Sequence, residues 1–321
     1  MIPVIDLAPE RSGHEHRTAG EHRTAEEISD ACRRTGFFVV RGHGIAREVF
    51  DDAYDASLRF FRLPLETKHA FPMRTSTARG DNDYSPYGYS ALLSENAYAY
   101  TGKPGMPSDY VEKFSTGRLI LDDEEELPFP EDELGKRLRA SLKEYFAACE
   151  TVAGRIAELL ALALDLPRDF FATRTNTSND SLRSHLYPGV APEFLNDQGM
   201  GQHTDGTLIT LLTQDGPGLQ LQDRAGRWLD IDVRERDSFI VNIGDLMARW
   251  SNDEYVSTPH RVRLADRQRQ SIVFFKLAND DTVIECFPKF AADRPAKYEP
   301  IRYEDYSLQK MNLLFGRDDA Q

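Results

Sequence analysis

The segment TLITLLTQDGPGLQLQ, which spans residues 207–222, decides the fold class of this chain. Apolar and β-branched residues fill Thr207–Thr213 and then Leu219–Gln222, and such runs are typical of buried strands. Between them stands Asp215-Gly216-Pro217-Gly218, whose residue types are those that tight turns require. The segment therefore predicts two short strands joined by a turn.

The stretch from Leu182 to Leu277 is predicted to contain further short strands. They are Trp228–Ile231, Ser238–Ile243, His260–Leu264 and Gln270–Leu277, and a second turn is expected at Asp223–Gly226. The first half of the chain differs, because its apolar residues recur every three or four positions. This spacing predicts helices over Ala25–Arg34, Arg47–Phe61 and Leu134–Leu166, with one short strand at Gly36–Val40. Helices followed by strands indicate an α+β protein whose sheets form a sandwich or an open barrel.

The composition favours one domain over residues 1–321. A chain of this length with 40% hydrophobic residues can bury a large core. We expect an N-terminal region of helices and strand over about 1–115, a strand core over about 180–280 and a C-terminal segment over 281–321.

Charge and cysteine content exclude several classes of protein. The 53 acidic residues outnumber the 39 basic residues, so the net charge of -14 disfavours a nucleic-acid partner. Three widely spaced cysteines without a zinc-binding pattern suit a reducing compartment. We see neither a signal peptide nor an apolar run long enough to cross a bilayer. We therefore expect a cytoplasmic monomer without a membrane partner.

His203 and Asp205 stand two residues apart in Q-H-T-D-G, just before the first quoted strand. On an extended chain both side chains leave from one face, which places a nitrogen ligand beside an oxygen ligand. This pair alone is a weak signal in a chain with 8 histidines and 53 acidic residues. His260, in T-P-H-R-V on another predicted strand, supplies a third metal ligand. Two imidazoles and one carboxylate leave coordination positions open, which suits iron(II) oxygen chemistry, whereas a structural zinc site needs four ligands.

A candidate anion anchor lies further along the chain, at Arg269 and Ser271, which again share one strand face. If the chain turns back around Leu264–Asp266, antiparallel pairing brings Arg269 level with His260 and close to the metal. A guanidinium can bind a carboxylate through two parallel hydrogen bonds. Tyr187 can donate a further hydrogen bond from a neighbouring strand. The charges of a divalent metal, one carboxylate and this arginine favour a dicarboxylate ligand.

These motifs resemble the core pattern of the isopenicillin N synthase-like family of 2-oxoglutarate and iron(II)-dependent dioxygenases. The likeness rests on H-T-D, S-T-P-H-R-V and R-Q-S, and it extends over nearly the whole chain. Further segments resemble family landmarks in family order: Ile2–Leu7, Gly36–Val40, His43–Ile45, Phe60–Pro64, Pro217–Gln220 and Asn242–Asp245.

The resemblance implies a double-stranded β-helix, or jelly-roll, core flanked by N-terminal and central helices. It also implies iron bound by His203, Asp205 and His260, and 2-oxoglutarate whose far carboxylate is bound by Arg269, Ser271 and Tyr187. The implied reaction consumes oxygen and 2-oxoglutarate, releases succinate and CO₂, and hydroxylates an aliphatic carbon, with desaturation or ring closure as variants. Because related halogenases replace the carboxylate ligand with a small residue, Asp205 disfavours halogenation.

The substrate is expected to be a small molecule such as an amino acid or an intermediate of specialised metabolism. The Gly-, Tyr- and Ser-rich stretch from Ser76 to Pro107 predicts a long loop, and Arg79 and Tyr89 in it are candidate substrate contacts. His185, and Phe275 on the inward parity of the Arg269 strand, are two further candidates.

Two other functions stay open at this point. The R-x-S pair is shared by relatives that do not consume 2-oxoglutarate, so one alternative is an iron(II) oxidase that takes its electrons from the substrate or from ascorbate. The other is a non-enzymatic barrel that binds a metal or a small acid. Succinate formation distinguishes the first alternative, and oxygen consumption distinguishes the second.

Overall fold

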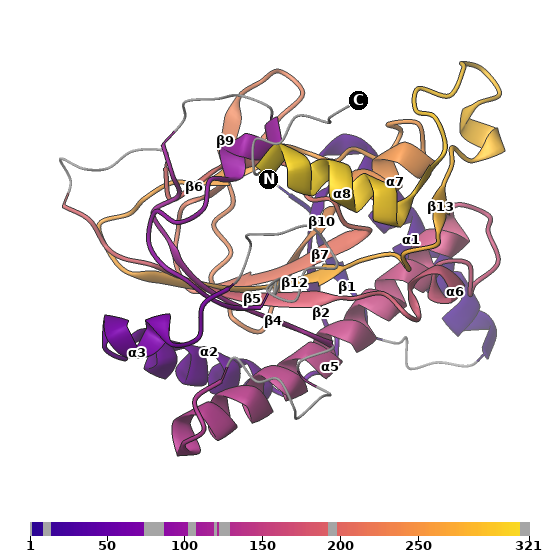
Figure 1. The fold of residues 1–321 in the computed structure, drawn as a ribbon. Helices are drawn as coiled ribbons and strands as arrows, with labels where there is room; N and C mark the ends of the chain where they lie inside the picture. The colour runs from indigo at the N-terminus through magenta and orange to yellow at the C-terminus, as the bar shows by residue number, and fades with distance from the viewer. Residues whose placement is uncertain are drawn as a thin grey trace.

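The computed structural model describes residues 2–8, 14–73, 87–101, 107–118, 121, 129–191 and 198–314. Two β-sheets form the centre of this part of the chain (Figure 1). The large sheet has eight strands, in the order β1 (Val4–Asp6), β2 (Phe37–Arg41), β10 (Phe239–Ile243), β7 (Ile209–Gln214), β12 (Arg269–Lys276), β5 (Ser181–Tyr187), β4 (Glu112–Gly117) and β3 (Gly88–Ser90). The small sheet has four, β6 (Met200–His203), β11 (His260–Val262), β8 (Leu219–Gln222) and β9 (Trp228–Asp230), while β13 (Val283–Ile284) and β14 (Ile301–Arg302) form a separate pair.

Helices cover the outer face of the large sheet. The described helices are α1 (His14–Arg34), α2 (Arg47–Phe61), α3 (Leu65–His69), η1 (Ala97–Thr101), α5 (Glu133–Ala163), α6 (Ala172–Thr175), α7 (Asp245–Trp250), η3 (Pro288–Phe290) and α8 (Tyr303–Leu314). Figure 1 shows α2 and the long α5 on one side of the sheets and α8 on the other side. The carboxylate of Asp132 caps the start of α5, because it accepts a hydrogen bond from the Gly135 amide at 3.0 Å.

Side-chain parity divides the large sheet into two faces. Residues of one parity, such as Leu182, Leu211 and Phe274, belong to the main apolar core that the sheet shares with α2 and α5. Residues of the other parity point toward the small sheet. A second apolar cluster joins the two sheets there, and it consists of Phe37, Val111, Tyr187, Leu219, Leu221, Ile231, Ile240 and Val262. The functional residues lie on this inner face.

The turn in the quoted segment forms as expected. Gly218 adopts a φ of +120°, a conformation that residues with a side chain rarely take. A Cβ at this position would lie only 2.6 Å from the carbonyl oxygen of Arg263. The glycine therefore allows β7 and β8 to separate into different sheets within a few residues.

Most predicted elements are confirmed, and so is the α+β jelly-roll class. The strands agree with the prediction to within two residues, and α2 spans Arg47–Phe61 as predicted. The helix predicted from Ala25 begins earlier, at His14, and the stretch over 134–166 is the single helix α5.

Two predictions are wrong. The stretch from Ser76 to Pro107 is not loop throughout, because its described part contains β3 and η1. The expected antiparallel pairing of the His260 and Arg269 strands does not occur either. β11 pairs with β6 and β8 in the small sheet, whereas β12 pairs with β5 and β7 in the large sheet. The chain between them crosses from one sheet to the other, so the two strands are not hydrogen-bonded to each other.

Among the described residues, none of the helices combines the length and the apolar character needed to cross a lipid bilayer.

Candidate active site

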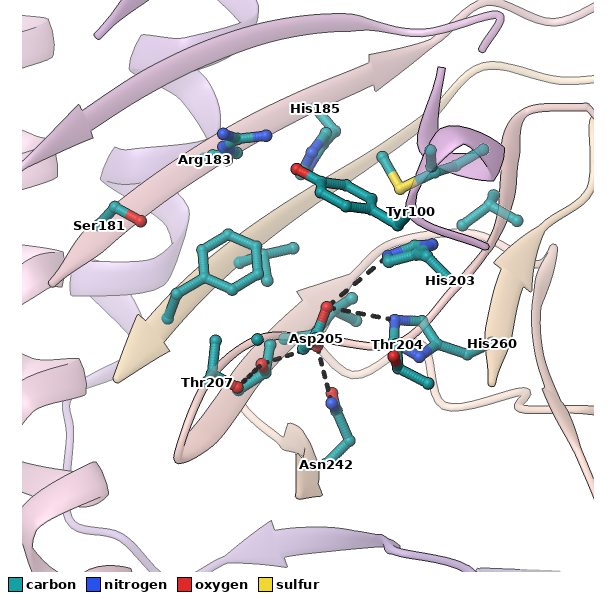
Figure 2. Close-up of a pocket in the computed structure, with 18 of the residues that line it drawn as sticks. Tyr100, Ser181, Arg183, His185, His203, Thr204, Asp205, Thr207, Asn242 and His260 are labelled. Atoms are coloured by element: carbon teal, nitrogen blue, oxygen red, sulfur yellow. Dashed lines mark hydrogen bonds and ion pairs between the residues drawn. The ribbon is translucent and has the colours of Figure 1, made fainter. Parts of the chain in front are cut away.

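His203, Asp205 and His260 converge on one point (Figure 2). His203 ends β6 and lies directly opposite His260 at the start of β11. The Nε2 atom of each ring is 3.7 Å from Asp205 Oδ1. Each residue offers one ligand atom, and the three atoms lie within 4.8 Å of one another. The predicted triad therefore exists as a group that can hold a single metal ion.

A backbone carbonyl orients each imidazole. His203 Nδ1 lies 2.8 Å from the Gly201 oxygen, and His260 Nδ1 lies 3.2 Å from the Thr258 oxygen. Because a carbonyl only accepts, each Nδ1 carries the hydrogen and each Nε2 presents its lone pair to the centre. Burial, and then the neighbouring His260, lower the pKa of His203 to about 3. The His203 ring is therefore in the neutral form that binds metals.

Thr210 and Asn242 fix the carboxylate of Asp205. The Thr210 hydroxyl and the Asn242 amide donate to Oδ2 over 2.7 and 2.8 Å, so Oδ1 faces the two imidazoles. Burial alone would raise the pKa of Asp205, but the imidazoles and these two hydrogen bonds lower it overall. The carboxylate stays charged, as a metal ligand must be. Sequence reasoning missed both donors, although Asn242 stands in one of the family landmarks.

The donor set suits iron(II). Two neutral nitrogens and one carboxylate oxygen are gathered on one side, and a cavity lies on the other. Within the described ranges no fourth His, Cys, Asp or Glu joins the group, so these residues do not form a closed zinc site. Two histidines and a carboxylate with open positions are the ligands of non-haem iron(II) oxygenases.

The cavity has a volume of about 260 Å³ and extends from the metal ligands along the inner face of the large sheet. β5 and β12 pair so that Tyr187 is opposite Arg269 and His185 is opposite Ser271. The lining residues on these two strands are Ser181, Arg183, His185, Tyr187, Ser271, Val273, Phe275 and, just after β12, Leu277. One wall therefore carries two of the predicted co-substrate residues, Tyr187 and Ser271, and two of the predicted substrate contacts, His185 and Phe275.

Arg269 lies at one end of this wall and is only 1% exposed. Its guanidinium donates to Ser271 Oγ at 3.3 Å and to Gln214 Oε1 at 2.7 Å, and it lies 4.7 Å from the centre of the Tyr187 ring. Burial raises the pKa of Tyr187 to about 12, so its hydroxyl keeps its hydrogen and can donate. Among the described residues no carboxylate pairs with this buried cation, which favours an anionic ligand beside it.

The structure does not bring Tyr89 to the cavity. Its hydroxyl donates to Glu112 Oε2 at 2.6 Å beside Lys68, and its ring packs against Phe60. Arg79, the other candidate from the same stretch, lies outside the described residues.

Several polar side chains that the sequence analysis did not single out complete the lining. They are Glu95, Tyr100, Lys113, Arg183 and Lys310. Arg183 could have been found, because it shares its parity with His185 and Tyr187 on β5. The others come from the segment before η1, from η1 itself, from β4 and from α8. No local sequence pattern shows how these elements fold over the sheet.

The C-terminal helix α8 is attached to the metal ligands through Asp245. The Asp245 carboxylate accepts a hydrogen bond from the Tyr306 hydroxyl at 2.6 Å and lies 2.7 Å from Lys310 Nζ. Lys310 also donates to the backbone oxygen of Thr204 at 3.0 Å. Because Thr204 stands between His203 and Asp205, α8 is fixed to the backbone that carries two of the ligands.

Two family models match this chain. Residues 2–147 match the N-terminal region of the non-haem dioxygenases in morphine synthesis, and residues 178–277 match the 2OG-Fe(II) oxygenase superfamily. Among solved structures, a full-length Neurospora crassa protein in complex with alpha-KG has a TM-score of 0.79 at 28% identity, covering 97% of this chain and 95% of that one. The same protein with alpha-KG and thymine has a TM-score of 0.78 at 27% identity, covering 97% and 96%.

Curated relatives agree with these matches. A homoarginine-6-hydroxylase of Oryza sativa subsp. japonica is 30% identical, over 98% of this chain and 97% of its own length. The 2-oxoglutarate-Fe(II) type oxidoreductase hxnY of Emericella nidulans is 32% identical, over 99% of this chain and 91% of its own length. The predicted resemblance, enzyme class and cofactors are thereby confirmed. Likeness of this extent along the whole chain means that it belongs to the superfamily of 2-oxoglutarate and Fe(II)-dependent oxygenases.

Proposed function

We propose that this oxygenase hydroxylates an aliphatic carbon of a small molecule, and that Arg269, Ser271 and Tyr187 bind the far carboxylate of 2-oxoglutarate. The observation that carries the proposal is the buried Arg269 guanidinium, which has hydrogen-bonding neighbours but no carboxylate partner among the described residues. Ser271 and Tyr187 line the same cavity as the metal ligands. A dicarboxylate can bind the metal with one end and the Arg269 guanidinium with its other carboxylate.

His203, Asp205 and His260 hold the metal in this proposal. When bound, Fe(II) and 2-oxoglutarate supply the chemistry that activates oxygen for insertion into a C–H bond, with succinate and CO₂ as co-products. The residues of the chain position the reactants: the triad leaves one side of the metal open, and the cavity wall holds the substrate near that side. His185 and Phe275, which line the cavity, are proposed substrate contacts.

A small-molecule substrate is supported by the size of the cavity, because about 260 Å³ holds a compact molecule and not a polymer. The net charge of -14 further disfavours nucleic acid. We also propose that the enzyme acts as a cytoplasmic monomer without a membrane partner.

Arg269→Lys tests the proposed co-substrate site. Lysine keeps the positive charge but loses the two-pronged hydrogen-bonding geometry, so the affinity for 2-oxoglutarate should fall by about tenfold or more. Binding is measured by anaerobic titration of the Fe(II)-loaded protein. Arg234→Gln, at an exposed arginine bonded to Asp232, serves as the control. Equal affinities in Arg269→Lys and wild type would contradict the assignment.

Product analysis tests the 2-oxoglutarate-dependent reaction. With Fe(II), oxygen and a panel of small molecules, the wild-type protein should release succinate in proportion to 2-oxoglutarate consumed. Oxygen uptake without succinate would support the oxidase that takes its electrons from the substrate or ascorbate. His260→Ala should remove both Fe(II) binding and succinate release, whereas His22→Ala, at an exposed histidine on α1, should change neither.

A further inference from the structure

The cavity contains a second arginine, at a different level from the proposed co-substrate anchor. Ser181, Arg183, His185 and Tyr187 share one parity of β5, and all four line the cavity. Arg183 lies four residues before Tyr187, which corresponds to about 13 Å along a strand. It is opposite Val273 on β12, whereas Tyr187 is opposite Arg269. Arg183 and Arg269 therefore lie at different levels of the cavity wall and would contact different ligand groups.

The hydrogen-bond donors of Arg183 are not used by the described protein. Its side chain is 29% exposed, and Glu95 Oε2 lies 3.6 Å from its Nη1, which is longer than a hydrogen bond. Its guanidinium carbon lies 5.9 Å from the centre of the Phe275 ring. A guanidinium has five N–H donors in a planar fork. Figure 2 shows Arg183 on the wall that faces the metal ligands, next to His185.

Nearby charges compensate Arg183 only in part. Glu95 Oε2 accepts a hydrogen bond from Lys113 Nζ at 3.0 Å, so this carboxylate is shared between two cations and is closer to the lysine. Burial would raise the pKa of Glu95, but Lys113 and then Arg183 lower it to about 2. The Glu95 carboxylate is therefore charged, and it interacts mainly with Lys113. The positive charge of Arg183 is therefore only partly neutralised, and its guanidinium can donate hydrogen bonds to a ligand oxygen.

The surroundings of Arg183 suit an apolar molecular body. Phe275, Tyr100, Val273 and Leu212 line the same cavity. His185 is 3% exposed, and its Nδ1 has no hydrogen-bond partner among the described residues. Burial, followed by the charges of Lys113 and Arg183, holds the pKa of His185 well below its usual range, so its ring is neutral. A neutral imidazole can donate or accept one further hydrogen bond.

We propose that Arg183 is the substrate anchor, and that the substrate carries a carboxylate or carbonyl oxygen on an apolar, ring-containing body. The oxygen accepts from the Arg183 fork, and the body lies against Phe275 and Tyr100 in front of the metal ligands. This inference deepens the proposed function and rests on it, because it assumes that Arg269 binds 2-oxoglutarate. A carboxylate and a neutral carbonyl share the acceptor oxygen, so the probes below distinguish them.

The test uses three probes and two variants of the Fe(II)-loaded protein with 2-oxoglutarate, without oxygen. Benzoate carries a carboxylate on a ring, uracil carries neutral carbonyls on a ring, and benzyl alcohol has a ring without either group. We expect benzoate or uracil to bind the wild-type protein, as measured by calorimetric titration, and benzyl alcohol not to bind. Arg183→Gln should weaken that binding by about tenfold or more, because a charged hydrogen-bond donor is lost.

Arg183→Lys separates charge from geometry. It should retain more binding of benzoate than of uracil, since a point charge attracts a carboxylate more strongly than a neutral carbonyl. Arg234→Gln should bind all probes as the wild type does. The unfolding temperature of each variant verifies that the fold is intact.

The proposal is overturned if neither benzoate nor uracil binds the wild type, or if Arg183→Gln binds them equally well. It is also overturned if Arg183→Gln weakens the binding of 2-oxoglutarate and leaves the binding of the probe unchanged, because Arg183 would then be a co-substrate residue. Failure of the proposed function gives a different result, in which the wild type does not bind 2-oxoglutarate at all or Arg269→Lys leaves its affinity unchanged.

Discussion

Asp205 differs from the two histidines in what fixes its position. A backbone carbonyl orients each imidazole, whereas two side chains orient the carboxylate, the hydroxyl of Thr210 and the amide of Asn242. A backbone carbonyl remains after any substitution, whereas a side-chain donor can be removed. The carboxylate is therefore the ligand whose geometry a single mutation outside the triad can loosen.

Thr210→Val tests this dependence, since valine keeps the shape of threonine without its hydroxyl. We expect the affinity for Fe(II) to fall by about tenfold, because outer hydrogen bonds to metal ligands contribute effects of about 10- to 100-fold. Anaerobic metal titration measures the change. Thr151→Val, at an exposed position on α5, is the matched control and should bind Fe(II) as the wild type does. Unchanged affinity in Thr210→Val would mean that Asn242 alone suffices.

At the scale of single residues, the spacing of His203 and Asp205 identified the triad only together with the motif around His260. His203 and Asp205 are neighbours on one strand face, and His260 stands in a recognisable motif. Arg183 could have been found from its parity with His185 and Tyr187 on β5, whereas the role of Thr210 depends on how the chain folds. Thr210 reaches Asp205 only because a turn of the chain before β7 brings the carboxylate back over its own strand.

At the scale of elements, α8 is held to the backbone beside the metal ligands by polar contacts. Tyr306 and Lys310 attach it to Asp245, and Lys310 also holds the Thr204 carbonyl. Tyr306, Ser307, Lys310 and Met311 line the cavity. The helix thus forms part of the cavity wall and also restrains the backbone between two ligands.

Lys310→Met should loosen this attachment. The methionine keeps the apolar stem but loses the hydrogen bond to Thr204 and the ion pair with Asp245. We expect faster proteolytic cleavage within α8 and weaker Fe(II) binding, measured by limited proteolysis and by metal titration. Lys136→Met, at an exposed lysine on α5 that pairs with Glu133, should alter neither. Wild-type proteolysis of Lys310→Met would show that the Tyr306 hydrogen bond and the apolar contacts are enough to hold α8.

At the level of elements, alternation and apolar spacing predicted the type of β7, β8, β12 and α2 correctly. Pairing was harder. Because β11 and β12 are close in sequence, a hairpin was the expected connection, but the two strands belong to different sheets. Only the packing of the whole sandwich decides which sheet a short strand joins.

For the whole molecule, buried charge networks make stability depend on pH. Glu95 has a folded-state pKa of about 2, below its ordinary value of 4.5. The folded protein therefore binds fewer protons than the unfolded chain in this range. The stabilisation from Glu95 is fully present above about pH 4.5 and is lost as the pH falls toward 2.

Glu95→Gln should reveal this contribution in thermal unfolding. The variant should be less stable than the wild type near pH 7, since Lys113 loses its closest carboxylate. The difference should shrink as the pH falls below 4.5, because the wild-type carboxyl then takes up a proton. Glu133→Gln, at a side chain that is 90% exposed, should follow the wild type at every pH. A difference that stays constant down to pH 3 would contradict this explanation.

The division of the ligands between the sheets has a consequence for apo and metal-bound protein. His203 and His260 belong to the small sheet, whereas Asp205 is held by Thr210 and Asn242 of the large sheet. A bound ion therefore cross-links two layers that are otherwise joined by a modest apolar cluster. Addition of Fe(II) should slow hydrogen–deuterium exchange in β6, β8 and β11, whose short strands open easily without it. Amides of α5, on the far side of the large sheet, should exchange at the same rate with and without the ion.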